Sequence, residues 1–198
     1  KTTLVKHCFP EYTYVNLEDP VNRMFAKEDY RGFFETYKEP VIIDEVQRVP
    51  ELLSAIQVMV DENRGKNGRF ILTGSHQPRL QRGIAQSLAG RTSMLTLLPL
   101  SMNELEEEGL LEELSADELL VKGFMPELYR EGSREPVVYY RDYLNTYVEK
   151  DLREMLEIKN LDKFLRFLIL LAGRVGQVVS LSAMSGEVGV SSTTLSEW

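Results

Sequence analysis

The chain has 198 residues, of which 43% are hydrophobic and 27% are charged, a composition typical of a soluble globular protein with one domain and part of another. A membrane-spanning chain is excluded, because the longest apolar run, Phe167 to Ala172, is far shorter than the roughly 20 residues that a bilayer requires. The single cysteine, Cys8, cannot form an internal disulfide, and with only His7 and His76 beside it no zinc site is expected. These features predict a cytoplasmic protein without a membrane partner.

The net charge of −8 is concentrated in one segment. Residues 101–135 contain 11 acidic and 3 basic residues, and the rest of the chain is balanced. This distribution argues against a surface that coats nucleic acid, which would need excess Lys and Arg.

The first hundred residues alternate short apolar runs with segments long enough for crossover helices, the pattern of an α/β parallel sheet with flanking helices. The second and third of these apolar runs each contain three consecutive apolar residues without alternation. Both are therefore predicted to be central strands that are buried on two faces. A helix is expected at Pro50–Val60 and a loop at Asn63–Gly68. The four expected strands are Thr13–Leu17, Val41–Asp44, Arg69–Thr73 and Met94–Leu98.

After residue 100 the pattern becomes helical. Acidic helices are expected at Ser101–Glu108, which opens with a Ser-x-x-Glu capping pair, and at Ala116–Lys122. An amphipathic helix follows at Tyr139–Ile158 and a more buried one at Leu161–Gly173. Three regions result: a sheet domain at 1–100, an acidic helical subdomain at 101–135, and the start of a further helical domain at 136–198.

The last seventeen residues resemble the middle of a helix-turn-helix, with Gly189 at the turn and Ser191 or Ser192 capping a helix that carries Leu195 and Trp198. DNA binding is one interpretation. However, no Lys or Arg follows Arg174, so the usual donors to phosphate are missing there. A structural or protein-docking role is therefore favoured.

Candidate chemistry lies in four places, each with a plainer alternative. The opening Lys1-Thr2-Thr3 could end a phosphate-binding loop or simply belong to a surface helix. The pair Asp44-Glu45 ends a predicted central strand, where a sheet binds ligands, although acidic residues also favour helix N-termini. One carboxylate there could hold Mg²⁺ through water while the next orients the attacking water.

The other two places are weaker by themselves. Thr73 and Ser75 follow a buried strand, where a hydroxyl could reach the γ-phosphate, or where the chain simply turns at Gly74. Arg91 follows Gly90 and could neutralise charge on a transferred phosphoryl group, although most such arginines are surface residues.

Taken in order, these motifs resemble a widespread bacterial and archaeal family of AAA-type P-loop ATPases with a C-terminal domain of unknown function. The segments that carry the resemblance begin with Lys1-Thr2-Thr3-Leu4 and continue with Tyr14 to Pro20, Val41 to Leu52, Phe70 to Ser75, Leu88 to Arg91 and Leu98 to Ser101. Further matches lie at Gly123–Glu127, Tyr143–Asp151 and Leu171–Gly176. The resemblance covers essentially the whole chain.

The resemblance implies a P-loop NTPase-like sheet, a helical lid-like subdomain and a partial winged-helix-like module, with ATP and Mg²⁺ as cofactors. It implies that Lys1, Thr2 and Thr3 bind nucleotide, with Thr2 and Asp44 at the metal. Glu45 would orient the water, Thr73 or Ser75 would act as sensor, and Arg91 would be a finger acting within its own subunit or on a neighbour in a homo-oligomer. A protein partner would use the C-terminal region.

The glycine loop that the family places before Lys1 is missing, so we expect the chain to be a fragment of a longer protein. About four charge-assisted hydrogen bonds at about 1.5 to 3 kcal/mol each would be lost, against about 8 kcal/mol for micromolar binding. We expect the parent protein to hydrolyse ATP and the isolated 198 residues to be nearly inert. The alternative is a nucleotide-dependent regulator or DNA-associated switch with little turnover.

Overall fold

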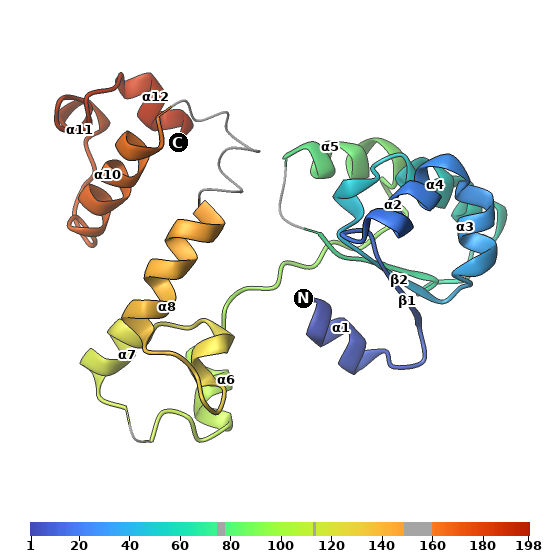
Figure 1. The fold of residues 1–198 in the computed structure, drawn as a ribbon, viewed down its shortest axis with the longest axis horizontal. Coiled ribbons are helices and arrows are strands. Elements are labelled where there is room, and N and C mark those ends of the chain that lie inside the picture. Colours follow the sequence, from blue (N-terminus) through green and yellow to red (C-terminus); the bar gives the residue numbers. More distant parts are fainter. Residues whose placement is uncertain (75–77, 113, 149–159) are drawn as a thin grey trace. The chain divides into compact units, whose positions relative to one another are not determined.

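The computed structural model describes residues 1–74, 78–112, 114–148 and 160–198 (Figure 1). The chain divides into two compact units, Lys1–Leu97 and Leu98–Trp198. None of the described helices combines the length and the apolar character that a bilayer crossing requires.

The first unit is built on a parallel three-stranded sheet in the order β1-β2-β3. The strands are β1 (Thr13–Asn16), β2 (Val41–Asp44) and β3 (Phe70–Leu72). Thr13 pairs with Val41, and Val41 pairs with Phe70, so the three strands end at the same edge of the sheet. The helices of this unit are α1 (Thr2–Cys8), α2 (Pro20–Glu28), α3 (Tyr30–Thr36), the 3₁₀ turn η1 (Val46–Arg48), α4 (Leu52–Glu62) and α5 (Pro78–Ser87).

The two faces of β2 have different neighbours. Val41 and Ile43 point into the main hydrophobic core, with Phe33 of α3 and with Leu52 and Ile56 of α4. Because side chains alternate along a strand, residues 42 and 44 point to the opposite face. Figure 1 shows α1 on one side of the strands and α2, α3 and α4 on the other. The face that carries position 44 is therefore the face of α1.

The structure confirms the first three predicted strands and the burial of β2 on both faces, where residues 41 to 43 are 0% exposed. It also confirms the 63–68 loop and the helix before it, which begins at Leu52. Two expectations are wrong. Phe70–Leu72 is the outermost of the described strands and is only partly buried, and Met94–Leu98 forms no strand, with Leu95 95% exposed.

Both corrections have one physical reason. A β-prone run becomes a strand only where another strand offers its backbone hydrogen bonds. Among the described residues, β3 pairs only with β2, so no ladder extends from β3 toward residues 94–98.

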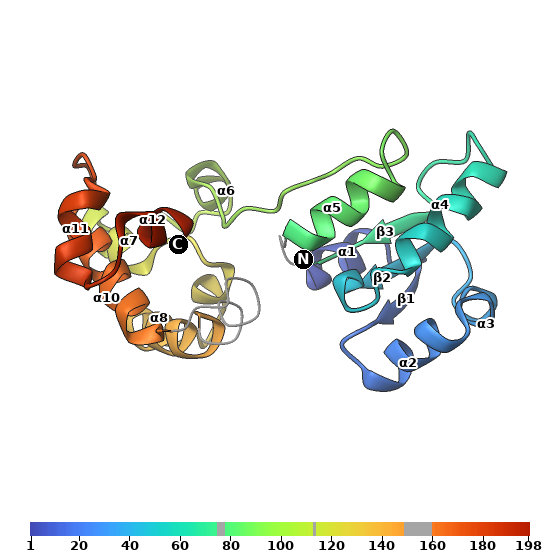
Figure 2. The ribbon, with the colours of Figure 1, turned by 90° about the horizontal axis from the view of Figure 1, so that it is seen from above.

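The second unit is helical among its described residues, and Figure 2 gives a second view of it. Ser101 and Ser115 cap α6 and α7 in full capping boxes with Glu104 and Glu118, which confirms the predicted starts of both helices. The elements are α6 (Met102–Glu107), α7 (Ala116–Lys122), η2 (Pro126–Tyr129), α8 (Pro136–Tyr143), the π-helical turn η3 (Leu144–Val148), α10 (Leu161–Ala172), α11 (Leu181–Val188) and α12 (Ser192–Glu197).

The predicted helix at Tyr139–Ile158 differs from the structure. Helix α8 begins three residues earlier, because Pro136 fits the first helical turn, and it widens into a π-helical turn at Leu144. Residues 149–159 lie outside the described part of the chain, and so does the rest of that prediction.

The helices at the end of the chain match their predicted positions. Leu181–Val188 is followed by Gly189 in the left-handed conformation, and Ser191 caps α12. Phe167, Met184 and Leu195 form a buried cluster against which Trp198 packs. The winged-helix interpretation goes beyond these elements and stays a prediction.

Candidate active site at the carboxyl edge of the sheet

The carboxylate of Asp44 collects three hydroxyl donors at the end of β2. Thr2 Oγ1, from the first turn of α1, donates to Asp44 Oδ2 at 2.7 Å. The Tyr14 hydroxyl, from β1, donates to the same oxygen at 2.8 Å. Thr73, which follows β3, donates to Oδ1. Three separate segments of the chain therefore converge on one side chain that is only 2% exposed.

These contacts decide the charge state of Asp44. Burial raises the pKa of this carboxyl, but the hydrogen bonds from Thr73, Thr2 and Tyr14, together with the nearby Lys6 ammonium, outweigh it and lower the pKa below its usual value. Asp44 is consequently an ionised acceptor at neutral pH. Burial, and then the hydrogen bond to Asp44, raise the pKa of Tyr14, so its phenol remains a donor.

Lys1 reaches the same edge from the start of α1. Its Nζ donates to the carbonyl oxygen of Gly74 at 2.5 Å, immediately after Thr73. Gly74 is a point of close approach: a Cβ built there would lie 2.5 Å from Gln47 Oε1 and 2.9 Å from Leu80 Cδ2. A glycine at this position lets the end of β3 pack against the turn that follows β2.

Glu45 follows Asp44 in a left-handed backbone conformation, with φ 59° and ψ 44°. The turn is held by the Val46 amide, which donates to the Thr73 carbonyl at 3.0 Å. The Glu45 carboxylate accepts a hydrogen bond from Gln47 Nε2. The second acid of the pair is thus held separately from the first.

The structure brings together Lys1, Thr2, Asp44, Glu45 and Thr73 at one edge of the sheet. Thr3 is exposed on α1. Ser75 lies outside the described residues.

Arg91 is placed elsewhere. Its guanidinium binds both carboxylate oxygens of Asp61, at 2.9 and 2.8 Å. Because α4 returns the chain from the end of β2 to the start of parallel β3, its last turn, which carries Asp61, lies at the amino edge. We call Asp44 and its three hydroxyl donors, Thr2, Tyr14 and Thr73, the Asp44 cluster. The structure therefore separates Arg91 from the Asp44 cluster of the same chain.

Two residues of this edge were missed by the sequence analysis. Tyr14 can be found only once the strand register is known, because its pairing with Ile42 places it on the face of β1 that points toward position 44. Gln47 cannot be found in this way, because its contact with Glu45 depends on the left-handed turn.

The donor set fits a magnesium–nucleotide ligand. Magnesium prefers oxygen ligands and is usually held by one or two carboxylates, water and substrate phosphates. Thr2 donates its proton to Asp44, which leaves lone pairs on its own oxygen for a cation. Among the described residues no group of three His, Cys, Asp or Glu side chains could hold a metal ion by itself. A magnesium ion that is bound together with phosphate does not need such a group, because water and phosphate oxygens supply its other ligands.

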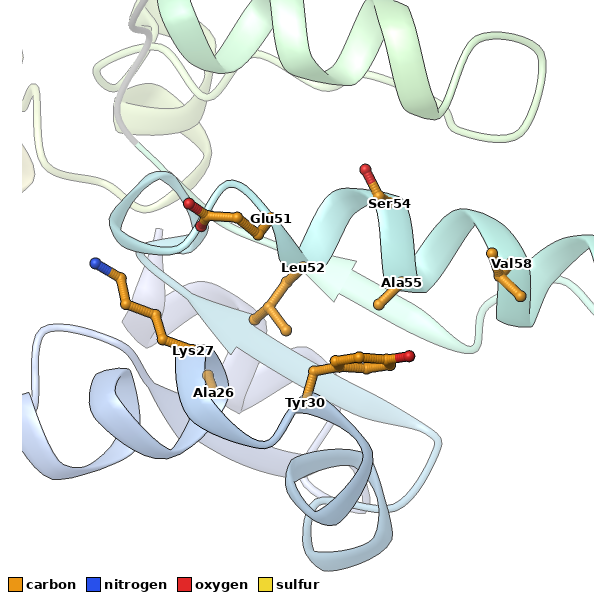
Figure 3. Close-up of a pocket in the computed structure, with 8 residues that line it drawn as sticks. All are labelled: Ala26, Lys27, Tyr30, Glu51, Leu52, Ser54, Ala55 and Val58. Carbon is orange, nitrogen blue, oxygen red and sulfur yellow. The ribbon is translucent and has the colours of Figure 1, made fainter.

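A hollow of about 340 Å³ lies on the other face of the sheet, between α2, α3 and α4. Figure 3 shows the Tyr30 ring turned toward Leu52 and Ala55. None of the predicted site residues lines it. The lining residues are Ala26, Lys27, Tyr30, Glu51, Leu52, Ser54, Ala55 and Val58.

Comparison with known proteins yields distant relatives. The chain is 29% identical over 204 residues to the uncharacterized protein Rv2008c of Mycobacterium tuberculosis, and equally to the uncharacterized protein Mb2031c of Mycobacterium bovis. Each match covers 98% of this chain and 43% of the relative, so the chain spans less than half the length of these proteins. No solved structure matches.

Two family models match in succession. Residues 113–198 match a domain of unknown function. Residues 1–106 match the AAA domain, and they include every member of the Asp44 cluster. Since that match covers more than half of the 198 residues, the chain belongs to the AAA domain family.

Proposed function

We propose that the protein carrying this chain binds Mg-ATP at the carboxyl edge of the sheet and hydrolyses it. The observation that carries the proposal is the convergence of Thr2 and Thr73 on the ionised Asp44 carboxylate, with Lys1 and Glu45 at the same edge. Membership of the AAA family supports nucleotide binding.

Each side chain has a role that suits its contacts. Thr2 and Asp44 would hold the magnesium ion, which when bound neutralises phosphate charge. The Lys1 ammonium donates to a neutral carbonyl in the structure, and a charged phosphate oxygen is a stronger acceptor that can replace that carbonyl. Thr3 would contribute its backbone to the same phosphate site.

Glu45 would orient the attacking water, because its carboxylate is held apart from Asp44 and its partner is a neutral amide. Thr73 or Ser75 would sense the γ-phosphate. Arg91 lies at the other edge of the sheet, so a contribution to phosphoryl transfer would have to be made to the site of another copy in a homo-oligomer.

The C-terminal helices favour a protein partner over DNA. The described helix-turn-helix elements α11 and α12 carry no Lys or Arg, and Arg174, which precedes them, pairs with Glu187 at 2.6 Å. We therefore propose that the nucleotide cycle acts on a protein through this region. A DNA-associated switch with little turnover is the second candidate, supported by the order of α11, Gly189 and α12.

The test is steady-state phosphate release by the full-length protein, comparing Glu45→Gln with Glu62→Gln, a change at an exposed position at the end of α4. Loss of a group that orients water or accepts its proton should slow turnover by about 10²-fold or more. Nucleotide affinity should stay within about twofold of wild type, because Glu45 touches the water and not the phosphates.

The control Glu62→Gln should turn over like wild type. Unchanged turnover in Glu45→Gln would remove Glu45 from the proposed role. A wild-type protein that binds ATP, hardly hydrolyses it and changes DNA affinity with nucleotide would favour the second candidate.

A further inference from the structure

We propose that Tyr14 is a positioning residue that fixes the Asp44 carboxylate for the divalent cation and thereby sets the affinity of the site for that cation. The inference rests on the proposed function, because it concerns the metal of that same site. The observation that carries it is the hydrogen bond from the hydroxyl of Tyr14, on β1, to the acid at the end of β2.

The two oxygens of Asp44 are not equivalent. Oδ1 accepts from Thr73, whereas Oδ2 accepts from both Thr2 and Tyr14, at 2.7 and 2.8 Å. Thr2 carries the hydroxyl that is proposed to bind the metal. The Tyr14 donor therefore acts on the same oxygen that accepts from Thr2, so removing it takes away one of the three hydrogen bonds that fix the orientation of the carboxylate.

The Tyr14 ring is itself held in place by α1. The Lys6 Nζ lies 3.5 Å from the centroid of that ring. Thr2 and Lys6 are four residues apart, so they lie on the same face of α1, and both face β1 and β2. One helix therefore positions the proposed metal-binding hydroxyl directly and the Tyr14 phenol through a cation–π contact.

Partners of this kind have large effects on metal sites. Groups that orient a metal-binding side chain typically change metal affinity or activity by about 10- to 100-fold when they are removed. We expect Tyr14→Phe to weaken cation binding by about tenfold, the lower end of that range, because Thr2 and Thr73 still hold Asp44.

The chain provides a matched control in Tyr12→Phe. The Tyr12 hydroxyl donates to the Gly68 carbonyl at 2.7 Å, ahead of β1 and β3 and hence at the amino edge. Both variants delete one phenolic hydrogen bond from neighbouring positions of the same segment. Only one of the two bonds involves the candidate site.

The experiment uses the full-length protein and Mn²⁺ as the probe cation, with binding followed by electron paramagnetic resonance in the presence of ADP. Tyr14→Phe should raise the dissociation constant of Mn²⁺ about tenfold, and Tyr12→Phe should leave it within about twofold of wild type. ADP affinity in EDTA should be the same in all three proteins, because the phenol does not touch nucleotide.

An Mn²⁺ affinity in Tyr14→Phe within about twofold of wild type would overturn the inference while leaving the proposed function intact. Equal losses in Tyr14→Phe and Tyr12→Phe would also overturn it, since they would show a general loss of structure. A wild-type protein that shows no Mn²⁺ binding with ADP would remove the proposed function and this inference together.

Discussion

Replacing Asp44 by Asn tests whether the buried carboxylate is ionised and satisfied by its three donors. The change keeps the side-chain shape but removes the charge. A hydrogen bond to a charged group contributes about 1.5 to 3 kcal/mol and a neutral one about 0.5 to 1.5 kcal/mol. The bonds from Thr2, Tyr14 and Thr73 would therefore lose about 1 kcal/mol each, and any hydroxyl that faces the new NH₂ group would have to accept from it instead of donating. Easier burial of a neutral amide offsets part of the sum, and we expect a net loss of about 2 kcal/mol.

The loss of stability in Asp44→Asn should depend on pH in a direction that follows from the pKa shift of Asp44. The pKa of Asp44 is lower in the folded state than in the unfolded chain, where it is about 3.9. The stability that this group contributes is fully present above the unfolded pKa and is lost as pH falls through the folded pKa. The difference between wild type and Asp44→Asn should thus be constant from pH 6 to 8 and shrink below about pH 4.

Hydrogen exchange of the peptide that covers β2, followed by mass spectrometry, reports the opening free energy of this unit separately from the helical unit. Asp29→Asn is the control, because Asp29 caps α3 through the Gly32 amide and Asn is an equally good cap. Equal protection of β2 in wild type and Asp44→Asn at pH 7 would refute the reasoning. So would a difference that persists unchanged at pH 3.

Two further changes test the packing of each unit. Arg69→Met should destabilise the first unit by about 2 kcal/mol, because it leaves the Glu39 carboxylate unpaired and removes a 2.8 Å bond to the Met59 carbonyl. Urea unfolding followed by exchange in β3 measures this loss, and a stability equal to wild type would show that the pair contributes nothing. Ser115→Ala should cost about 1 kcal/mol locally through loss of the capping box of α7. Exchange in the α7 peptide should increase while that in α10 stays unchanged, and unchanged α7 exchange would contradict the role of the cap.

Much of the sheet could be predicted from local pattern. Val41-Ile42-Ile43 is apolar without alternation, a pattern that favours a strand covered on both faces and that holds for β2 but not for Phe70–Leu72. Parallel strands end at one edge, so the polar residues that follow them meet there. The meeting of Asp44 with Thr73 follows from that geometry.

The remainder depends on interactions that no single segment encodes. Met94–Leu98 has the composition of a strand, but composition does not supply the neighbouring ladder. Arg91 follows a glycine as an arginine finger could, yet its partner Asp61 lies thirty residues away on another element. The Tyr14 contact spans two strands and needs their register before it can be read.

The left-handed backbone at Glu45 has a cost in stability. Among the described residues it is the only non-glycine with positive φ, a conformation that costs an L-residue about 1 kcal/mol relative to glycine. Glycine would relax the turn but would delete the carboxylate. Glu45→Gly is therefore expected to stabilise the turn and, under the proposed function, to slow ATP turnover through loss of the carboxylate.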